Sequence, residues 1–183
     1  MILYHVSFNA IENGILYPRI PESRAPHEDK SIPRICFADS IENCLTAIPG
    51  GGRALKNLLF RSRIMPISAV LHVYHINTLN VPKENLVPNS EVARYVPDAK
   101  HTGEAWVVNQ NVVCTHQIIE VTNAHVKHGT DLYGKDIYEV RYLEWRPLGE
   151  LPPNAPEIMI EKAKARLNIG AGFSTRSVLA EWD

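Results

Sequence analysis

The stretch Arg34–Ile48, RICFADSIENCLTAI, changes its hydrophobic period halfway along. Ile35–Ala38 is a short apolar run that has the length of a buried strand and is too short for a helix. Asp39 and Ser40 follow it, and both residue types accept backbone N–H bonds at helix N-caps. Apolar residues then recur at helical spacing until Pro49 and three glycines end the pattern. We therefore expect a strand, a polar turn and an amphipathic helix, with Ser40 at a strand end where ligands often bind.

Alternating or β-branched runs predict several further strands. The N-terminal run, Ile2–Ser7, contains the polar His5 among aromatic and β-branched residues. On sequence alone, a histidine in such a strand is more often a satisfied interior residue than a catalytic one. The other predicted strands are Val70–Ile76, Glu104–Val108, Val112–Val121 and Ile137–Trp145.

Proline, glycine and charge mark the predicted loops. Pro18–Pro33 holds four prolines and six formally charged residues, which predicts a long loop of the kind that is usually functional or mobile. Asn123–Lys135 is also loop-like, and Pro147–Pro156 is a proline-rich break. We expect a short helix or turn over Asn9–Tyr17. We also expect a helix over Glu157–Leu167, which is rich in alanine, lysine and glutamate.

Short strands mixed with a few helices predict an α+β fold with a mixed or antiparallel β core. A chain of 183 residues fits one domain and is long enough to bury a core without metal or disulfides. We expect a single domain over residues 1–183, with residues 147–183 forming a C-terminal helix and tail packed on it.

Composition and charge exclude little. A hydrophobic content of 45% and a charged content of 21% are those of an ordinary globular protein, and a net charge of −1 gives no prior for nucleic acid or an anionic membrane. Three cysteines, an odd count without a CxxC pair, indicate a reducing compartment. The first residues lack a basic leader region, and no apolar run reaches membrane-spanning length. We therefore expect a cytoplasmic protein without a membrane partner.

Two patterns that could bind metal or nucleotide are incomplete. On a strand, His72 and His75 would face opposite ways, and His125 and His128 lie in the predicted loop, so we expect no metal site. The basic segment 50–63 begins with three glycines but lacks the GxxxxGK[ST] order of a nucleotide P-loop.

Three short motifs, taken in their order along the chain, resemble the ADP-ribosyltransferase fold family in its diphtheria-toxin-like branch. LYHVSF places His5 in an early strand, RICFADS places Phe37 and Ser40 where a strand enters a helix, and GEAWVV places Glu104 at the head of a later strand. The resemblance implies a split β core with flanking helices, whose crevice holds NAD.

The resemblance also implies the chemistry and the residues that perform it. The expected reaction is NAD-dependent mono-ADP-ribosyl transfer, in which an ionised Glu104 stabilises the positive charge that develops on the ribose when nicotinamide leaves. The expected acceptor is a macromolecule, with protein favoured and nucleic acid as the other class. The residues expected to bind NAD are His5, Ser7, Tyr17, Arg19, Arg24, Phe37 and Ser40.

Within these roles, His5 would hold the adenosine-side ribose, and Arg19 or Arg24 would clamp the pyrophosphate. The helix after Ser40 lacks the tyrosine of one branch of the family, which leaves Tyr17 or Phe37 to stack on nicotinamide. Thr102 stands where the arginine-modifying branch has a second acid, which disfavours arginine as the acceptor.

Four other functions stay open on the sequence. One is a catalytically silent member of the same fold that binds NAD or a nucleotide, and another is a plain protein-interaction module. A third is a metal-dependent hydrolase, which the histidine spacing disfavours. The last is NAD-dependent removal of an RNA 2′-phosphate, which the basic residues between Arg53 and Arg63 favour.

Overall fold

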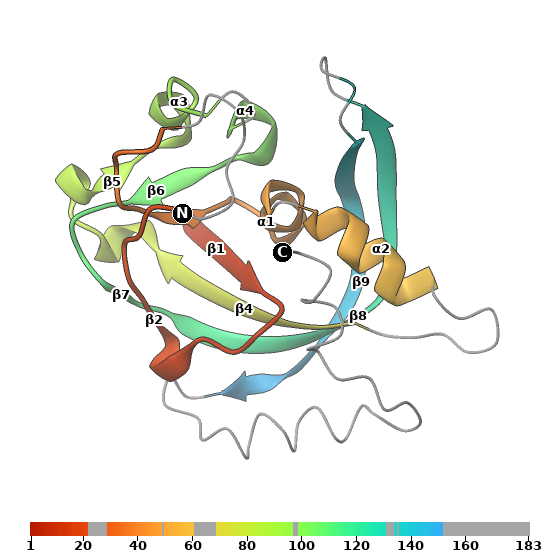
Figure 1. Cartoon of the computed structure of the whole chain (residues 1–183). Helices are drawn as coiled ribbons and strands as arrows, with labels where there is room; N and C mark the ends of the chain where they lie inside the picture. The colour runs from red at the N-terminus through yellow and green to blue at the C-terminus, as the bar shows by residue number, and fades with distance from the viewer. Residues whose placement is uncertain are drawn as a thin grey trace.

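The computed structural model describes residues 1–21, 29–48, 50–60, 69–96, 99–130, 134 and 136–151. Their strands outnumber their helices, and most of the chain's pairing is antiparallel (Figure 1). In chain order the elements are β1 (Ile2–Ser7), the 3-10 turn η1 (Glu12–Gly14), β2 (Ile15–Leu16), β3 (Ile35–Phe37), α1 (Ile41–Ala47), α2 (Gly51–Phe60), β4 (Ala69–Asn77), the 3-10 turns η2 (Thr78–Asn80) and η3 (Lys83–Asn85), β5 (Leu86–Val87), α3 (Asn89–Val92), α4 (Ala99–Thr102), β6 (Ala105–Val107), β7 (Val112–Val113), β8 (Thr115–Thr130) and β9 (Asp136–Leu151).

The largest sheet is antiparallel, with the strand order β1-β4-β8-β9. It curls into a half-barrel, because β8 and β9 are long strands whose pairing shifts register at three places, and such irregularities bend and twist a sheet. Figure 1 shows these two strands curving around α1 and α2. The predicted α+β class with a largely antiparallel β core is therefore confirmed.

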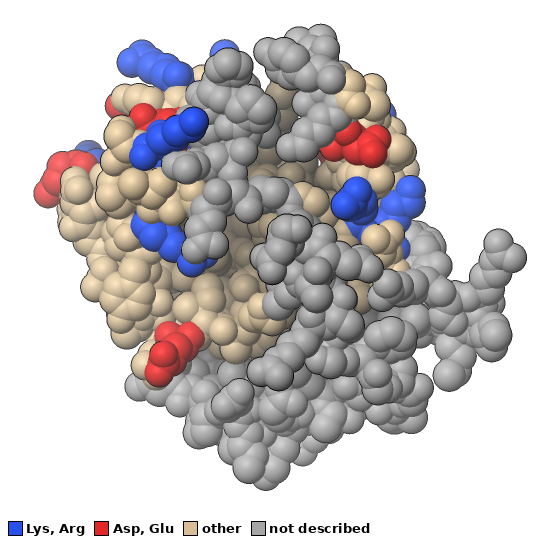
Figure 2. All heavy atoms as spheres, in the orientation of Figure 1, with Lys and Arg blue, Asp and Glu red and all other residues tan. Residues whose placement is uncertain are grey.

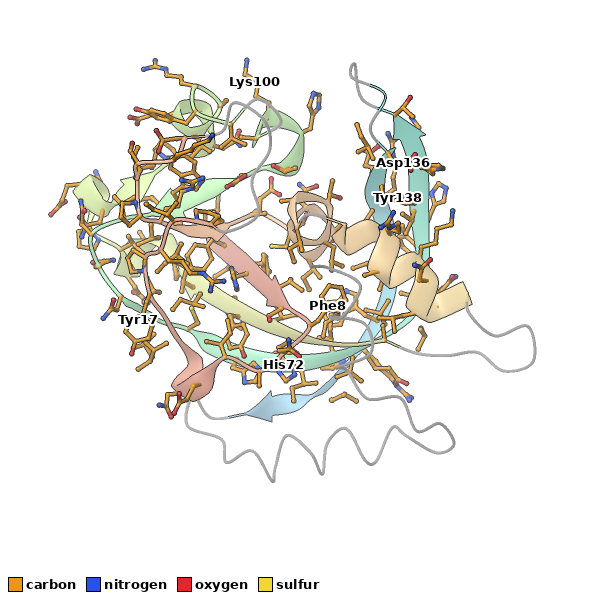
Figure 3. The ribbon with its side chains drawn as sticks, in the orientation of Figure 1. Phe8, Tyr17, His72, Lys100, Asp136 and Tyr138 are labelled. Atoms are coloured by element: carbon orange, nitrogen blue, oxygen red, sulfur yellow. The ribbon has the colours of Figure 1, made fainter. Side chains whose placement is uncertain are left out.

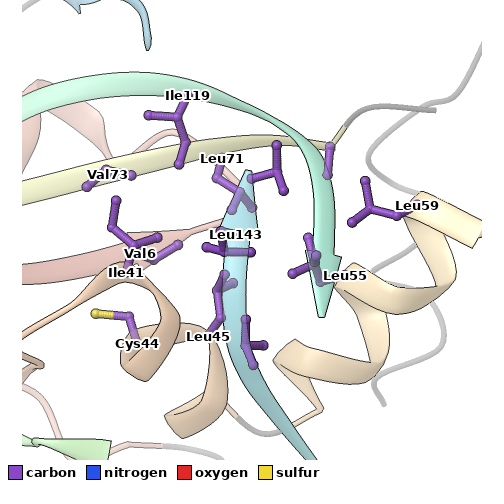
Figure 4. Close-up of a cluster of buried hydrophobic side chains, with 14 of the residues drawn as sticks. Val6, Ile41, Cys44, Leu45, Leu55, Leu59, Leu71, Val73, Ile119 and Leu143 are labelled. Carbon is purple, nitrogen blue, oxygen red and sulfur yellow. The ribbon is translucent and has the colours of Figure 1, made fainter. Parts of the chain in front are cut away.

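The main core lies between the two helices and the concave face of this sheet (Figure 4). Leu45 of α1 and Leu55 of α2 are both fully buried, and they face Leu71, Ile119 and Leu143 of the sheet. Each such side chain stabilises the fold by about 1.5–3 kcal/mol relative to an exposed one. This packing explains why two short helices separated by a glycine turn hold their places.

A second, smaller sheet has the order β3-β6-β5, and β2 pairs with β7 beside it. The central strand β6 pairs antiparallel with β3 on one side and β5 on the other. Helices α3 and α4 pack near β6, with Trp106 fully buried beneath them. In Figure 1 these two helices cover the small sheet on the side away from β4.

The two sheets meet at a single antiparallel bridge between Tyr4 of β1 and Ala38, just after β3. Tyr4 N donates to Ala38 O, and Ala38 N donates to Tyr4 O, both at 2.8 Å. Beyond this bridge β1 continues along β4, while β3 continues along β6. The β core is thus divided into two sheets at this point.

Several predicted elements are confirmed. The strands that contain His5, Phe37 and the Val70–Ile76 run form where the pattern placed them. Ser40 is the N-cap of α1, and its Oγ accepts a hydrogen bond of 3.1 Å from Asn43 N. The predicted turn before Tyr17 is η1.

Two loop predictions are wrong. Residues 123–130, predicted as loop, belong to β8, because pairing with β9 supplies the hydrogen bonds that their polar sequence does not predict. The predicted break at Pro147 is part of β9 as far as Leu151. A proline is tolerated there since β9 is the edge strand of this sheet among the described residues. The predicted helix Glu157–Leu167 and the rest of the C-terminal segment after Leu151 lie outside the described residues.

No helix within the described ranges is both long enough and apolar enough to cross a bilayer.

Candidate active site

The pairing of β3 with β6 brings the strand after Arg34 against the strand after Glu104. Cys36 lies directly opposite Trp106, and Phe37 opposite Ala105. Since side chains alternate across a strand, Glu104 and Trp106 share one face of the small sheet, and Arg34 and Cys36 share the same face opposite them. Two charged residues therefore meet on a face that also carries a thiol and an indole.

Glu104 is held from several directions. Its carboxylate Oε1 accepts a 2.7 Å hydrogen bond from Trp106 Nε1, and the residue is 7% exposed. Its backbone N donates to Ala99 O at 3.3 Å, and its backbone O accepts from Asn89 Nδ2 at 3.0 Å. The position of Glu104 is thus fixed by both its main chain and its carboxylate.

The turn that leads into Glu104 requires glycine. Gly103 has a φ of +61°, which side-chain-bearing residues rarely adopt. A Cβ at this position would also lie 2.5 Å from Asp39 Oδ1. The carboxylate of Asp39, at the start of α1, therefore packs directly over the residue before Glu104.

The Cys36 thiol lies between a positive and a negative group. Burial raises its pKa well above the usual range, the charge of Glu104 and a hydrogen bond to that carboxylate raise the pKa further, and Arg34 opposes both. The sulfur therefore stays a protonated thiol, on the face of the small sheet that also carries Glu104.

Arg34 is almost completely buried, with 1% of its surface exposed. Its guanidinium lies 4.3 Å from the centre of the Trp106 ring, and its Nη1 donates to the backbone O of Ile32 at 3.1 Å and of Asp29 at 3.3 Å. Because buried charges need partners, a buried cation beside the buried Glu104 offsets the cost of removing both from water.

His5 reaches the same strand from the other sheet. Its Nδ1 lies 2.9 Å from the backbone O of Cys36, and since a carbonyl can only accept, Nδ1 carries the proton. Burial lowers the pKa of the imidazole, the bond to Cys36 opposes that shift, and the positive charge of Arg19 lowers the pKa further. His5 is therefore neutral near pH 7, with Nε2 as its acceptor.

Cys36 thus lies between His5 of the first motif and Glu104 of the last motif. Its carbonyl accepts from His5, and the charge of Glu104 acts on its thiol, which shares a face of the small sheet with that residue. These contacts lie close to the Tyr4–Ala38 bridge, where the β core divides. The fold therefore brings His5 and Glu104, which are far apart in the sequence, to the two sides of one strand residue.

The remaining expected site residues lie at different distances from this centre. Arg19 exchanges two backbone hydrogen bonds with Arg34, of 3.1 and 3.0 Å, and its charge acts on His5. Phe37 is 2% exposed, and its ring meets the His5 ring edge-on at 6.1 Å, so it supports His5 from the core side. Ser7 shares a face of β1 with His5, and its Oγ accepts from Asn9 N at 3.1 Å.

The hydroxyl of Ser40 is engaged by α1 itself, so its observed role is to cap that helix. Tyr17 is 59% exposed and lies at the margin of the molecule beside β2 (Figure 3). Arg24 is outside the described residues.

Three residues of the centre were missed by the sequence reasoning. Cys36 was considered only as one of the three cysteines that indicate a reducing compartment, and Arg34 and Trp106 were given no role. A signal was nevertheless present, because R-x-C and E-x-W each place their two residues on one face of a strand. The register that sets these faces against each other was not visible in the sequence.

A separate cavity of about 460 Å³ lies near the ends of β1 and β4, lined in part by Ile2, His75, Asn80, Gln110 and Thr115. None of the residues of the His5–Glu104 centre lines it.

Among the described residues no group of three or more His, Cys, Asp or Glu side chains is arranged to hold a metal ion. His125 and His128 lie three apart on β8, which turns their side chains to opposite faces of the strand. His128 instead pairs with Asp136, at 2.7 Å between Nε2 and Oδ1.

No protein-family model, curated protein or solved structure matches this chain.

Proposed function

We propose that the chain is an NAD-dependent mono-ADP-ribosyltransferase. It would break the bond between nicotinamide and ribose C1′ and transfer ADP-ribose to a macromolecular acceptor. The observation that carries this proposal is the contact of both His5 and Glu104 with Cys36, at the point where the β core divides. His5 belongs to the first and Glu104 to the last of the three motifs that resemble the family.

The chemistry needs a fixed negative charge. When the glycosidic bond breaks, its electron pair leaves with nicotinamide, and positive charge develops on the ribose. A carboxylate held in place beforehand stabilises that charge without reorganising, and such stabilisation is often the largest single catalytic effect. Glu104, anchored by Trp106 and through its own main chain, meets this requirement.

Substrate binding needs neutral and positive groups at the other side. A neutral His5, with Nδ1 used by Cys36, presents Nε2 as an acceptor for a ribose hydroxyl. Arg19, whose charge acts on His5, would pair with the pyrophosphate, and guanidinium groups bind phosphate through two parallel hydrogen bonds. The two sheets joined at one bridge also agree with the split core that the resemblance implies.

The acceptor completes the reaction. Its nucleophilic atom bonds to C1′ and loses its proton as nicotinamide departs. On the face shown in Figure 2 the described Lys and Arg side chains lie in separate groups, with acidic residues among them. Together with the net charge of −1, the described residues give no basic excess that would favour a nucleic acid, so we take protein as the acceptor.

The test is the steady-state release of nicotinamide from NAD by the wild type and by Glu104→Gln, with Glu91→Gln as the matched control. Glu91 is an exposed acid on α3. We expect Glu104→Gln to lower the rate at least 100-fold, because it removes the charge and keeps the shape, and Glu91→Gln to match the wild type. Equal rates for all three proteins would remove Glu104 from the mechanism.

A silent NAD-binding protein is the second candidate. The low exposure of Glu104 and its engagement by Trp106 favour it, since a structural carboxylate would be held in the same manner. Saturable NAD binding to the wild type, with no nicotinamide release in the presence or absence of cell lysate, would identify this function.

A further inference from the structure

We propose that Trp106 and Cys36 are positioning residues that hold the Glu104 carboxylate in one orientation for cleavage of the nicotinamide–ribose bond. The inference rests on the proposed function and adds to it two residues that bind no part of the substrate. They act through Glu104 alone. The indole N–H donates to Glu104 Oε1, and the thiol S–H lies on the same face of the small sheet as that carboxylate.

The first donor is geometrically well defined. Trp106 lies two residues after Glu104 on β6, so both side chains leave the strand on the same face. The bond from Nε1 to Oε1 is 2.7 Å long, and Trp106 is fully buried. A short bond from a neutral donor to a charged acceptor, away from water, is stronger than an ordinary surface hydrogen bond.

The indole is itself held in place. The Arg34 guanidinium covers its ring at 4.3 Å, and the Tyr95 ring approaches it at 5.6 Å between ring centres. Val92 and Val96 pack in the same buried cluster. These contacts fix the position of the indole, so the hydrogen bond from its N–H fixes the position of Glu104 Oε1.

The second donor comes from the neighbouring strand. Cys36 lies opposite Trp106 in the β3–β6 pairing, so its S–H shares the face of the small sheet that carries the Glu104 carboxylate and is placed to donate to it. The thiol stays protonated over the whole range in which proteins usually work, because burial and the charge of Glu104 both raise its pKa. It is thus a donor throughout that range.

Two donors from two strands restrict rotation about the last side-chain bond of Glu104. That torsion is otherwise broad, so a carboxylate without such partners samples many orientations. Holding a catalytic group in one productive orientation raises the rate of the chemical step and leaves substrate affinity nearly unchanged. The two donors are therefore expected to affect kcat for nicotinamide release and to leave the Kd for NAD unaltered.

The first test is Trp106→Phe, with Trp145→Phe as the control. Phenylalanine keeps a ring under Arg34 and loses the N–H donor, whereas Trp145 is 41% exposed on β9. We expect Trp106→Phe to lower kcat about 10- to 100-fold, the range for loss of one hydrogen bond to a charged group, with the Kd for NAD within about twofold of the wild type. Trp145→Phe should behave as the wild type.

The second test compares Cys36→Ala with Cys36→Ser. Neither changes the carbonyl that His5 uses, and the two variants differ by one hydroxyl. Serine restores a donor, so we expect Cys36→Ser to retain kcat within about threefold, while Cys36→Ala loses about tenfold. Retained activity in both variants would show that the thiol is packing only and would overturn its role.

A third measurement is independent of turnover. The indole N–H resonance that disappears in Trp106→Phe should move upfield in Glu104→Gln, because a neutral amide oxygen is a weaker acceptor than a carboxylate. An unmoved resonance would contradict the hydrogen bond. If Trp106→Phe fails to fold, judged by its thermal midpoint, the two Cys36 variants decide the question.

Failure of the inference and failure of the proposed function give different results. Nicotinamide release that needs Glu104 but tolerates both Trp106→Phe and Cys36→Ala would overturn the positioning role alone. A wild type that releases no nicotinamide would overturn both.

Discussion

Cys36 uses its main chain and its side chain for different partners. Its carbonyl accepts from His5, and its thiol lies on the face of the small sheet that carries Glu104. A cysteine in an apolar run is ordinarily a small core residue. In the role proposed for Cys36, the protonated thiol serves as a neutral hydrogen-bond donor to a carboxylate.

His5 makes the stability of the folded protein depend on pH. Burial lowers the pKa of its imidazole in the folded state, so the unfolded chain binds a proton more readily. Its contribution to stability is therefore complete above the unfolded pKa of about 6.5 and is lost as the pH falls below that value. Burial also lowers the pKa of His116, so His116 changes the stability with pH in the same direction.

We predict that the wild type loses stability between pH 7 and pH 5 and that His5→Gln loses less stability over the same interval, because burial lowers the pKa of His5 in the folded state only. Glutamine cannot take up a proton and keeps a donor for the Cys36 carbonyl. The measurement is urea unfolding at both pH values, with the exposed His101→Gln as the control. An identical pH dependence in the wild type and His5→Gln would show that His5 titrates normally in the folded protein.

At the scale of elements, α2 packs so closely against β9 that one of its positions requires glycine. Gly52, in its first turn, lies against the main chain of Tyr138 on β9, and a Cβ on Gly52 would overlap the Tyr138 carbonyl oxygen. Figure 3 shows Tyr138 on the part of the β8–β9 ribbon that runs beside α2. Backbone atoms of a paired strand cannot move aside as a flexible side chain can.

Gly52→Ala should therefore destabilise the protein by about 2 kcal/mol, the usual cost of overpacking, in spite of the better helix propensity of alanine. Gly129→Ala on β8 is the matched control, because a Cβ there meets nothing within 4 Å. Denaturant unfolding of both variants gives the comparison. A Gly52→Ala protein as stable as the wild type would mean that α2 can shift away from the sheet at little cost.

The elements also show how far the sequence could be interpreted. Local patterns predicted β1, β3 and the capped helix α1, since their periods and the Ser40 cap are local properties. The far half of β8 was not predictable, because its polar residues form a strand only through pairing with β9. The same holds for the site: the residues 5 and 104 were recognisable as motif residues, whereas the pairing of Cys36 with Trp106 depends on tertiary register.

At the scale of the whole molecule, the site lies where two differently supported sheets meet. The large sheet is anchored by the core under α1 and α2, and the small sheet by the cluster around Trp106. The Tyr4–Ala38 bridge joins them, and His5 adds a side-chain bond beside it. His5 and Glu104 therefore come from elements on the two sides of this junction.

The most direct test of the proposed function is a single-turnover measurement with enzyme in excess over NAD, for the wild type and Glu104→Gln, after the Kd for NAD has been determined for each. We predict Kd values within about twofold of each other and a cleavage rate at least 100-fold lower in Glu104→Gln, because the carboxylate acts on the charge that develops only as the bond breaks. Equal cleavage rates, or a wild type that neither binds nor cleaves NAD, would contradict the proposal.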